Sequence, residues 1–280
     1  MARPESCPDK AQAGRPGRSL RVLQFTDCHL FADPGSRLVG VDTAASLKSV
    51  IGAARSYWHQ PDLIILTGDL SQDETAGSYR KLKELFCVFQ CPIYYLPGNH
   101  DLPEVMDPIL TRAPAAFSAD RSVVAGDWQI VLLNSRVEGR VEGRLPPDEL
   151  SYLERCLAGR PDLNAIVCLH HSPVSIGVPW MDEIALTNPE DLFAVLDRFQ
   201  VVRAVVWGHI HQEFESSQGA VRLLAAPSTC IQFKSCLKFG VDTRPPGYRW
   251  FRLSAKGQLD TGVKRLAHAP EGLDLTAAGY

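Results

Sequence analysis

The chain has 280 residues, of which 45% are hydrophobic and 22% are charged, and its formal net charge is -3. This composition is typical of a soluble globular protein that can bury a large core. The slightly negative charge excludes a global basic field of the kind that attracts nucleic acid. No segment approaches the ~20 consecutive apolar residues of a membrane-spanning helix. We therefore predict a cytoplasmic protein without nucleic-acid or membrane partners, and the sequence leaves its oligomeric state open.

One elaborated domain is expected over residues 20–267, with a tail at each end. Residues 1–19 are rich in Pro, Gly, Arg and Ala and lack an apolar run, which is typical of a disordered tail and not of a secretory signal. Residues 268–280 are expected to be loosely ordered. The eight cysteines include no CxxC pair, so in a chain of this length we expect them to be reduced and structural.

Strand-like and helix-like patterns alternate along the first part of the chain. We predict a strand over 20–26, a helix from an Asp42 N-cap to Trp58, a strand over 63–67, a helix over 75–89 and a strand over 92–96. The apolar residues of the first helix recur with the spacing of one helical face, which indicates that this face covers a sheet.

Strands dominate the second part of the chain. We predict a hairpin over 123–133 with its turn near Gly126-Asp127, a helix over 146–158, a strand over 165–169, a helix from an Asn188 N-cap to Phe199, a strand over 201–207, and short strands after it. Alternating strands and helices followed by mostly strands favour an α/β fold: a two-sheet β-sandwich flanked by helices.

Five short segments with metal-ligand side chains each follow an apolar run. They are Asp27-Cys28-His29, Gly68-Asp69, Gly98-Asn99-His100-Asp101, His170-His171 and Gly208-His209-Ile210-His211. A parallel sheet gathers the carboxyl ends of its strands at one edge, so the five segments should converge there. Each segment alone could be an ordinary loop or cap. All five together, in this order, predict a metal site.

The residue types indicate which metals this site would hold. Carboxylates and imidazoles suit Zn, Mn or Fe. Asp27 and His29 should point the same way on an extended backbone, and so should His209 and His211. Cys28 should then face the opposite side, so it is not counted as a ligand. Asp69 can bridge two metals, and Asn99 can supply a neutral carbonyl oxygen.

Two metal ions ~3.5–4 Å apart clamp a phosphoryl group and activate a shared water as hydroxide. The expected chemistry is therefore hydrolysis of a phosphodiester by a metal-bridged hydroxide. His100 would protonate the leaving oxygen, and Asp101 would orient the His100 imidazole. His171 is left open between simple packing, a contact with substrate and a contact with metal.

The order of these motifs resembles the calcineurin-like metallophosphoesterase superfamily, over about residues 21–263. Several stretches are similar to the bacterial class III 3',5'-cyclic-AMP phosphodiesterases: LQFTDCHLFADP, LVGVDT, LTGDLSQD, YYLPGNHDLP, VWGHIHQEF and LAAPSTCIQFK. The resemblance implies one metal on Asp27, His29, Asp69 and His211, and a second on Asp69, Asn99, His170 and His209. It also implies that the metals are iron and manganese and that the product is 5'-AMP.

The resemblance favours cyclic AMP as a small-molecule substrate. The alternative is another small phosphodiester such as a glycerophosphodiester, because the metals recognise the phosphate and not the alcohol. Asn99, His100, His171, Ser228 and Thr229 are the predicted substrate-binding residues. Gln232 and Phe233 could also contact a ribose or base, or the whole 227–233 stretch could be a plain loop and strand. A preference between cyclic AMP and cyclic GMP is not settled by the sequence.

Two other functions fit less well. A scaffold protein of this superfamily would have lost ligands, whereas every ligand position is filled here. A nuclease would need a basic stripe, which the chain lacks.

Overall fold

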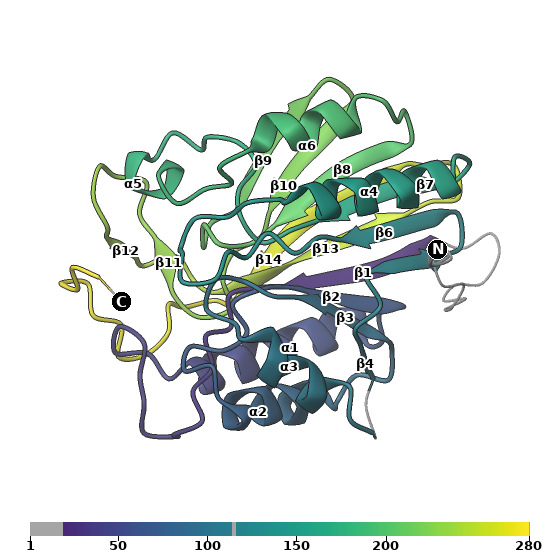
Figure 1. Ribbon diagram of the computed structural model, residues 1–280. Helices are drawn as coiled ribbons and strands as arrows, with labels where there is room; N and C mark the ends of the chain where they lie inside the picture. Colours follow the sequence, from purple (N-terminus) through teal and green to yellow (C-terminus); the bar gives the residue numbers. More distant parts are fainter. Residues whose placement is uncertain (1–18, 114–115, 280) are drawn as a thin grey trace.

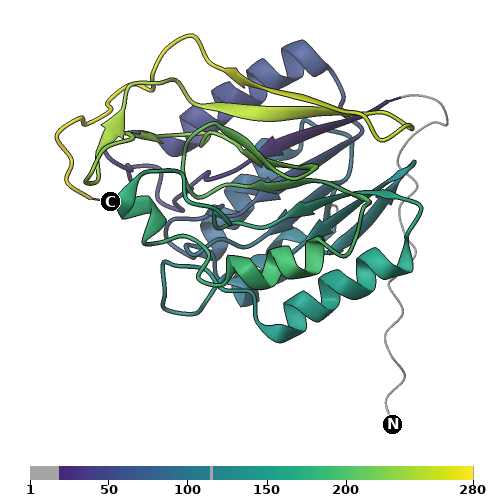
Figure 2. The same ribbon diagram turned by 90° about the horizontal axis from the view of Figure 1, so that it is seen from above.

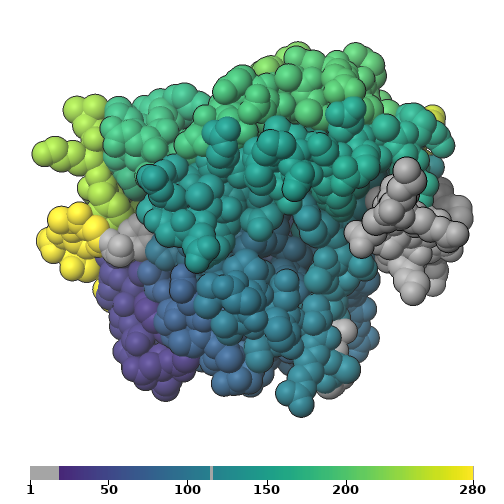
Figure 3. All heavy atoms as spheres, in the orientation of Figure 1, coloured from purple at the N-terminus to yellow at the C-terminus, as the bar shows by residue number. Residues whose placement is uncertain are grey.

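Two six-stranded sheets pack face to face, and helices cover the outer face of each sheet (Figure 1). The computed structural model describes residues 19–113 and 116–279. Seen with all atoms, a blue and purple layer and a green layer meet across the middle of the molecule (Figure 3). The α/β sandwich predicted from the sequence is confirmed.

The first sheet contains a parallel block extended by an antiparallel pair. Its order is β14-β13-β1-β2-β3-β4. The strands are β1 (Leu20–Phe25), β2 (Leu63–Thr67), β3 (Ile93–Leu96), β4 (Phe117–Ser118), β13 (Gly247–Leu253) and β14 (Leu259–Arg265). Its outer face is covered by α1 (Thr43–Trp58), α2 (Ala76–Phe86) and α3 (Pro103–Leu110) (Figure 1).

The second sheet has the order β5-β6-β7-β8-β10-β9. Its strands are β5 (Ser122–Ala125), β6 (Trp128–Leu132), β7 (Asn164–Cys168), β8 (Val202–Trp207), β9 (Phe214–Gln218) and β10 (Val221–Ala225). The outer helices are α4 (Pro147–Gly159) and α6 (Pro189–Leu196). The short helix α5 (Pro179–Asp182) and the small ribbon of β11 (Gln232–Phe233) and β12 (Val241–Asp242) lie at one end of the sandwich (Figure 1).

The core is divided into three apolar layers, one between the sheets and one beneath each set of helices. Strand β2 is buried at all of its positions, because the other sheet covers one face and helices cover the other. This explains why its sequence is an unbroken apolar run and not an alternating one.

Two buried polar side chains link the sheets within the core. Gln24 of β1 donates from Nε2 to Thr67 Oγ1 and to Trp207 O, both at 2.9 Å. Arg249 of β13, its partner in register, donates from Nε and Nη2 to Ala225 O at 3.1 and 3.0 Å. Desolvation lowers the pKa of Arg249 to about 10, so the guanidinium is still charged at neutral pH. The two side chains thus bind the two sheets through strong polar contacts.

Most predicted elements are confirmed, with changes at their ends. Asp42 caps α1 by accepting a hydrogen bond from Ala45 N at 3.0 Å. Helix α2 ends at Phe86 and not at residue 89, because Phe89 N turns back to Phe86 O. Helix α6 likewise ends at Leu196, short of the predicted residue 199.

Asn188 stands at the predicted N-cap position of α6, but its amide does not cap that helix. It accepts from Leu145 N at 3.0 Å and donates to Leu145 O at 2.8 Å instead. A loop that is distant in sequence therefore takes the hydrogen bonds that a cap would use. Helix α3 was not predicted, because Pro108 lies inside it and interrupts the helical pattern.

The carboxyl-terminal segment after β14 lies at the end of the sandwich towards which β1 and β2 run (Figures 1 and 2). Over residues 266–279 it forms no helix or strand. Its Asp274 N donates to Val39 O at 3.0 Å, and Gly40 and Gly272, both at φ +80°, touch through their backbones. The predicted amino-terminal tail lies outside the described residues, except for Ser19.

Among residues 19–113 and 116–279, none of the helices combines the length and the apolar character that a bilayer crossing requires.

Candidate metal centre

The five predicted ligand segments converge at one edge of the sandwich. Strands β1, β2 and β3 are parallel neighbours in one sheet, and β7 and β8 are parallel neighbours in the other. The two sheets meet directly at this edge, where His209 N donates to Asp27 Oδ1 at 3.0 Å. The convergence that parallel strands predict is therefore confirmed.

The backbone at these segments is strained. Asp27, His29, Asp69, His209 and His211 all have a positive φ, between 45° and 66°. Residues other than glycine rarely adopt this region, and such residues cluster at functional sites. The prediction that the Asp-x-His and His-x-His pairs lie on extended backbone is wrong. The side chains still reach the site, because left-handed residues turn the chain at each strand end.

Asp27, His29 and His211 form a first cluster, with ligand atoms within 4.8 Å of one another. His29 Nδ1 donates to Gln72 Oε1 at 2.6 Å, and His211 Nδ1 donates to Ile231 O at 2.9 Å. These contacts fix the tautomers, so each Nε2 keeps its lone pair. The two Nε2 atoms lie 3.1 Å apart. Two facing lone pairs repel, and a cation between them removes the repulsion.

His170, His209 and Asn99 form a second cluster of the same kind. His170 Nδ1 donates to Thr67 O at 2.8 Å, and His209 Nε2 donates to Ile184 O at 2.9 Å. The remaining nitrogens, His170 Nε2 and His209 Nδ1, face each other at 3.2 Å. Asn99 Oδ1 lies 3.1 Å from His170 Nε2. The second cluster therefore offers two imidazole nitrogens and one amide oxygen as possible ligand atoms.

Asp69 lies between the two clusters. Its Oδ2 is 3.7 Å from His29 Nε2 and 3.3 Å from His170 Nε2. Oδ1 accepts from His100 N, whereas Oδ2 is buried without a hydrogen-bond partner among the described residues. A buried carboxylate oxygen without a donor is costly. Cations in both clusters would remove that cost, so the donor set fits two metal ions bridged by Asp69.

The electrostatics agree with this donor set. Burial lowers the pKa of His29 and of His209 to about 3, so both imidazoles are neutral at pH 7. Burial alone would raise the pKa of Asp69, but His170 and His100 hold it well below its usual range. Burial likewise opposes a charge on His170, yet Asp69 raises its pKa to about 9. The centre thus attracts positive charge.

Asp101 clamps two of the ligand loops together. Its buried carboxylate accepts from Leu70 N at 3.1 Å, Ser71 N at 3.1 Å and Gly98 N at 2.9 Å, and from Tyr79 Oη at 3.1 Å. These donors belong to the loops after β2 and β3 and to α2. The expectation that Asp101 orients His100 stays a prediction.

His100 lies beside the first cluster. Its ring centroid is 5.1 Å from that of His29, and the residue is partly exposed. Its backbone N–H holds Asp69 Oδ1 at 2.9 Å. His100 is therefore near enough to the centre to contact a substrate bound there.

His171 is buried beside the second cluster, and one of its ring nitrogens lies within 4.8 Å of ligand atoms of His170 and His209. Its Nδ1 lies 2.8 Å from Ser135 Oγ, and its Nε2 donates to Val141 O at 3.0 Å. Its ring centroid is 4.7 Å from that of His209. These contacts favour packing, the first of the three possibilities left open by the sequence, and a substrate contact stays a prediction.

The 227–233 stretch returns to the site as expected from the sequence. Ser228 Oγ donates to Asp27 O at 2.8 Å, Thr229 is fully buried, and Phe233 stacks on His211 with centroids 4.1 Å apart. Cys28 is also buried and packs in the core beneath the helices of the first sheet. The contacts of Ser228 and Phe233 hold ligand residues in place, and the substrate roles of Ser228 and Thr229 stay predictions.

Sequence reasoning missed the residues that orient the ligands. Gln72 is the main example, since it lies three residues after Asp69 and fixes the tautomer of His29. The carbonyl acceptors at Thr67, Ile184 and Ile231 leave no sequence signal, because any residue carries a carbonyl group.

Sandwich topology, two facing clusters and a shared carboxylate together define a dinuclear hydrolase site. The model of the calcineurin-like phosphoesterase family matches residues 20–213, and the chain belongs to this family.

The chain is 40% identical over 263 residues to the 3',5'-cyclic adenosine monophosphate phosphodiesterase CpdA of Pseudomonas aeruginosa, covering 94% of this chain and 96% of the relative. It is 42% identical over 262 residues to CpdA of Escherichia coli K12, covering 93% and 95%. A dimetal phosphatase from Danio rerio has a similar fold, with a TM-score of 0.59 at 13% identity over 89% of this chain and 99% of that chain.

Proposed function

We propose that this chain hydrolyses 3',5'-cyclic AMP to 5'-AMP at a dinuclear metal centre. The observation that carries the proposal is the buried Asp69 Oδ2, which lacks a donor and lies between two pairs of facing imidazole nitrogens. Relatives at 40% and 42% identity over nearly their whole length, both named cyclic-AMP phosphodiesterases, support the choice of substrate.

The two clusters would hold the ions as the sequence resemblance implies. Asp27, His29, Asp69 and His211 would hold one ion, and Asp69, Asn99, His170 and His209 the other. Imidazole and oxygen donors without a thiolate suit iron and manganese, which we propose as the metals. When bound, such ions neutralise charge on the phosphate and supply the nucleophile from water.

The remaining steps belong to side chains of this protein. His100 donates a proton to the oxygen that leaves phosphorus, because it is partly exposed and adjacent to the first cluster. Asp101 fixes the separation of the loops that carry Asp69 and Asn99. Gln72 keeps the His29 lone pair turned towards the centre.

Another small phosphodiester, such as a glycerophosphodiester, is the second candidate substrate. It would use the same residues, since they all act on the phosphate group. We further propose a small-molecule substrate in the cytoplasm, with no nucleic-acid or membrane partner.

The test uses the purified protein reconstituted with manganese and assayed on cyclic AMP, cyclic GMP and bis(p-nitrophenyl) phosphate. We expect release of 5'-AMP that EDTA abolishes and that added manganese restores. Cleavage of the nitrophenyl ester without cleavage of cyclic AMP would retain the dinuclear centre and reject the cyclic nucleotide.

A further inference from the structure

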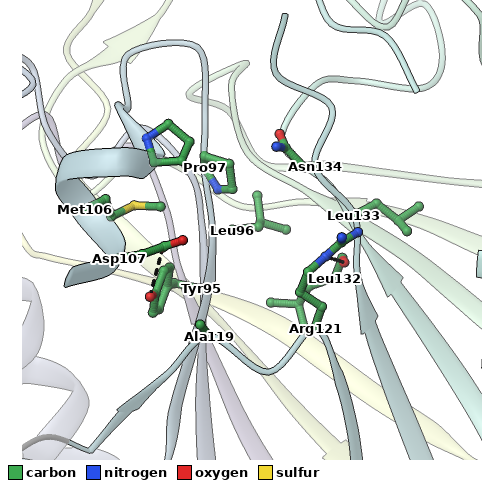
Figure 4. Close-up of a pocket in the computed structure, with 11 residues that line it drawn as sticks. Tyr95, Leu96, Pro97, Met106, Asp107, Ala119, Arg121, Leu132, Leu133 and Asn134 are labelled. Atoms are coloured by element: carbon green, nitrogen blue, oxygen red, sulfur yellow. Dashed lines mark hydrogen bonds between the residues drawn. The ribbon is translucent and has the colours of Figure 1, made fainter. Parts of the chain in front are cut away.

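A cavity of about 110 Å³ opens between the two sheets at their free edge (Figure 4). Leu96 and Pro97 line it from the end of β3, and Leu132, Leu133 and Asn134 line it from the end of β6. None of these residues belongs to the two clusters. The cavity is therefore separate from the metal ligands and is built from side chains of both sheets.

Both walls of the cavity continue directly into the second cluster. Leu132 pairs with Cys168 in the β6–β7 register, and two residues further along each strand come Asn134 and His170. The segments that follow β6 and β7 are still adjacent there, since His170 N donates to Ser135 Oγ at 3.4 Å. On the opposite wall, Pro97 precedes Asn99 by two residues, a span of about 7 Å at most.

The distance from the edge of the cavity to a phosphate held at Asn99 and His170 is therefore short. It is comparable to the distance between phosphate and base across a ribose ring. A nucleotide whose phosphate is bound at the second cluster can thus extend its base into the cavity.

The lining suits a flat heteroaromatic ring. Leu96, Leu132 and Met106 supply apolar surface and are almost fully buried. Asp107 lies on one side of Leu96 and Asn134 on the other (Figure 4). Tyr95 and Arg121 are the other polar residues of the lining, and the Arg121 guanidinium is paired with Glu149. Apolar walls with a few polar groups are the usual form of a small-molecule pocket.

Asp107 is the acidic group of this lining. Its Oδ1 accepts from Tyr95 Oη at 3.0 Å, which leaves the second carboxylate oxygen to accept from a ligand. Burial raises the pKa of Asp107 even though the Tyr95 hydrogen bond opposes the rise. Asp107 itself is exposed at the mouth of the cavity, so its free oxygen can be reached by a ligand.

We propose that this cavity binds the purine base of the cyclic nucleotide and that Asp107 accepts a hydrogen bond from its 6-amino group. The inference rests on the proposed function and deepens it by assigning base recognition. Guanine carries an oxygen at that position, which would face the carboxylate as a second acceptor. The protein should then prefer cyclic AMP to cyclic GMP, a preference that the metal ligands cannot provide.

Ala119 provides the test, because it is exposed and lines the cavity away from the metal ligands. In the Ala119→Phe variant the phenyl ring fills the space of the base. We expect KM for cyclic AMP to rise at least about tenfold, while kcat/KM for bis(p-nitrophenyl) phosphate stays within twofold. Ala267→Phe is the matched control, since Ala267 is also exposed but lines a different cavity.

Asp107→Ala tests the hydrogen bond separately. The ratio of kcat/KM for cyclic AMP to that for cyclic GMP should fall about tenfold or more. Binding of 5'-AMP to the manganese-loaded protein, measured by calorimetry, should weaken in both cavity variants and not in Ala267→Phe.

The outcomes separate this inference from the proposed function. A wild-type protein that cleaves the nitrophenyl ester but not cyclic AMP overturns both. A wild-type protein that cleaves cyclic AMP, with Ala119→Phe unchanged towards it, overturns only the base pocket. Equal losses on cyclic AMP and on the nitrophenyl ester would also overturn it, because the substitution would then act on the metal centre.

Discussion

Oδ2 of Asp69 lies 3.3 Å from Nε2 of His170 and has no hydrogen-bond donor among the described residues. Asp69→Asn should therefore remove the bridge, because an amide oxygen carries no charge to share between two ions. We expect one bound ion or fewer per chain and a loss of activity above about 100-fold. Elemental analysis of the dialysed protein measures the number of bound ions per chain. Asp62→Asn, in a partly buried ion pair with Arg21, is the control. Two ions retained in Asp69→Asn would reject the bridging role.

Gln72 should affect metal affinity more than turnover. Gln72→Leu removes the acceptor of His29 Nδ1, so the imidazole can rotate or change tautomer. Affinity for the first ion should fall about 10–100-fold, with much of kcat recovered at saturating metal. A metal titration of activity and of binding checks this. Gln60→Leu, which removes only a surface contact with Gln90, should leave both curves unchanged.

His100→Ala distinguishes a proton donor from a structural residue. Cyclic AMP has a poor leaving oxygen that needs a proton, whereas nitrophenolate leaves without one. The loss of kcat should be about 10²–10⁴-fold on cyclic AMP and much smaller on bis(p-nitrophenyl) phosphate. If both substrates lose activity equally, His100 is not the general acid.

Arg249 should contribute strongly to the free energy of unfolding. Arg249→Met removes the guanidinium donors to Ala225 O, which is buried, and to Phe214 O, which is half-buried, and this loss should cost about 2–4 kcal/mol. Urea unfolding at saturating manganese measures the change. Arg252→Met, on the same strand but exposed, should cost less than about 1 kcal/mol, and similar costs for the two variants would contradict the sheet-linking role.

Asp73 gives a prediction for pH dependence. Its carboxylate accepts from Ala32 N at 2.6 Å and from Thr75 Oγ1 at 2.9 Å. Burial would raise its pKa, but these bonds outweigh burial and lower it below 3.8. A lowered folded-state pKa stabilises the protein above the unfolded value and loses that effect as pH falls through the folded value.

Asp73→Asn should consequently destabilise the protein by about 1 kcal/mol at pH 7, a modest figure because the group is partly exposed to solvent. The difference from wild type should narrow as pH falls below 3.8. Thermal unfolding at several pH values measures it, and a difference independent of pH would show that the charge of Asp73 has no part in the effect.

The sequence predicted the convergence of the ligands because that property follows from strand direction alone. Asp27, Asp69 and His170 each end an apolar strand, and parallel strands end at one edge. It could not predict the left-handed backbone at Asp27 or His209, because that strain is imposed by the surrounding tertiary contacts.

The sequence could not predict the hydrogen-bond partners of residues whose partners lie far away in the chain. The buried carboxylate of Asp101 bonds to a loop about 30 residues earlier in the chain, and its neighbours in sequence do not indicate that contact. Asn188 is predicted to cap a helix, but its side-chain amide is hydrogen-bonded to the backbone of Leu145 instead. In both cases local sequence identified a polar residue with a structural task, and only the fold determined its partner.

The two clusters share more than Asp69. His209 directs its imidazole to the second cluster, while its backbone N–H holds Asp27 of the first. An ion that orders either cluster therefore pre-forms part of the other. Metal uptake should accordingly be cooperative, with a steep loading curve and few singly occupied molecules, so that a cell short of one metal would hold a mixture of fully loaded and empty protein.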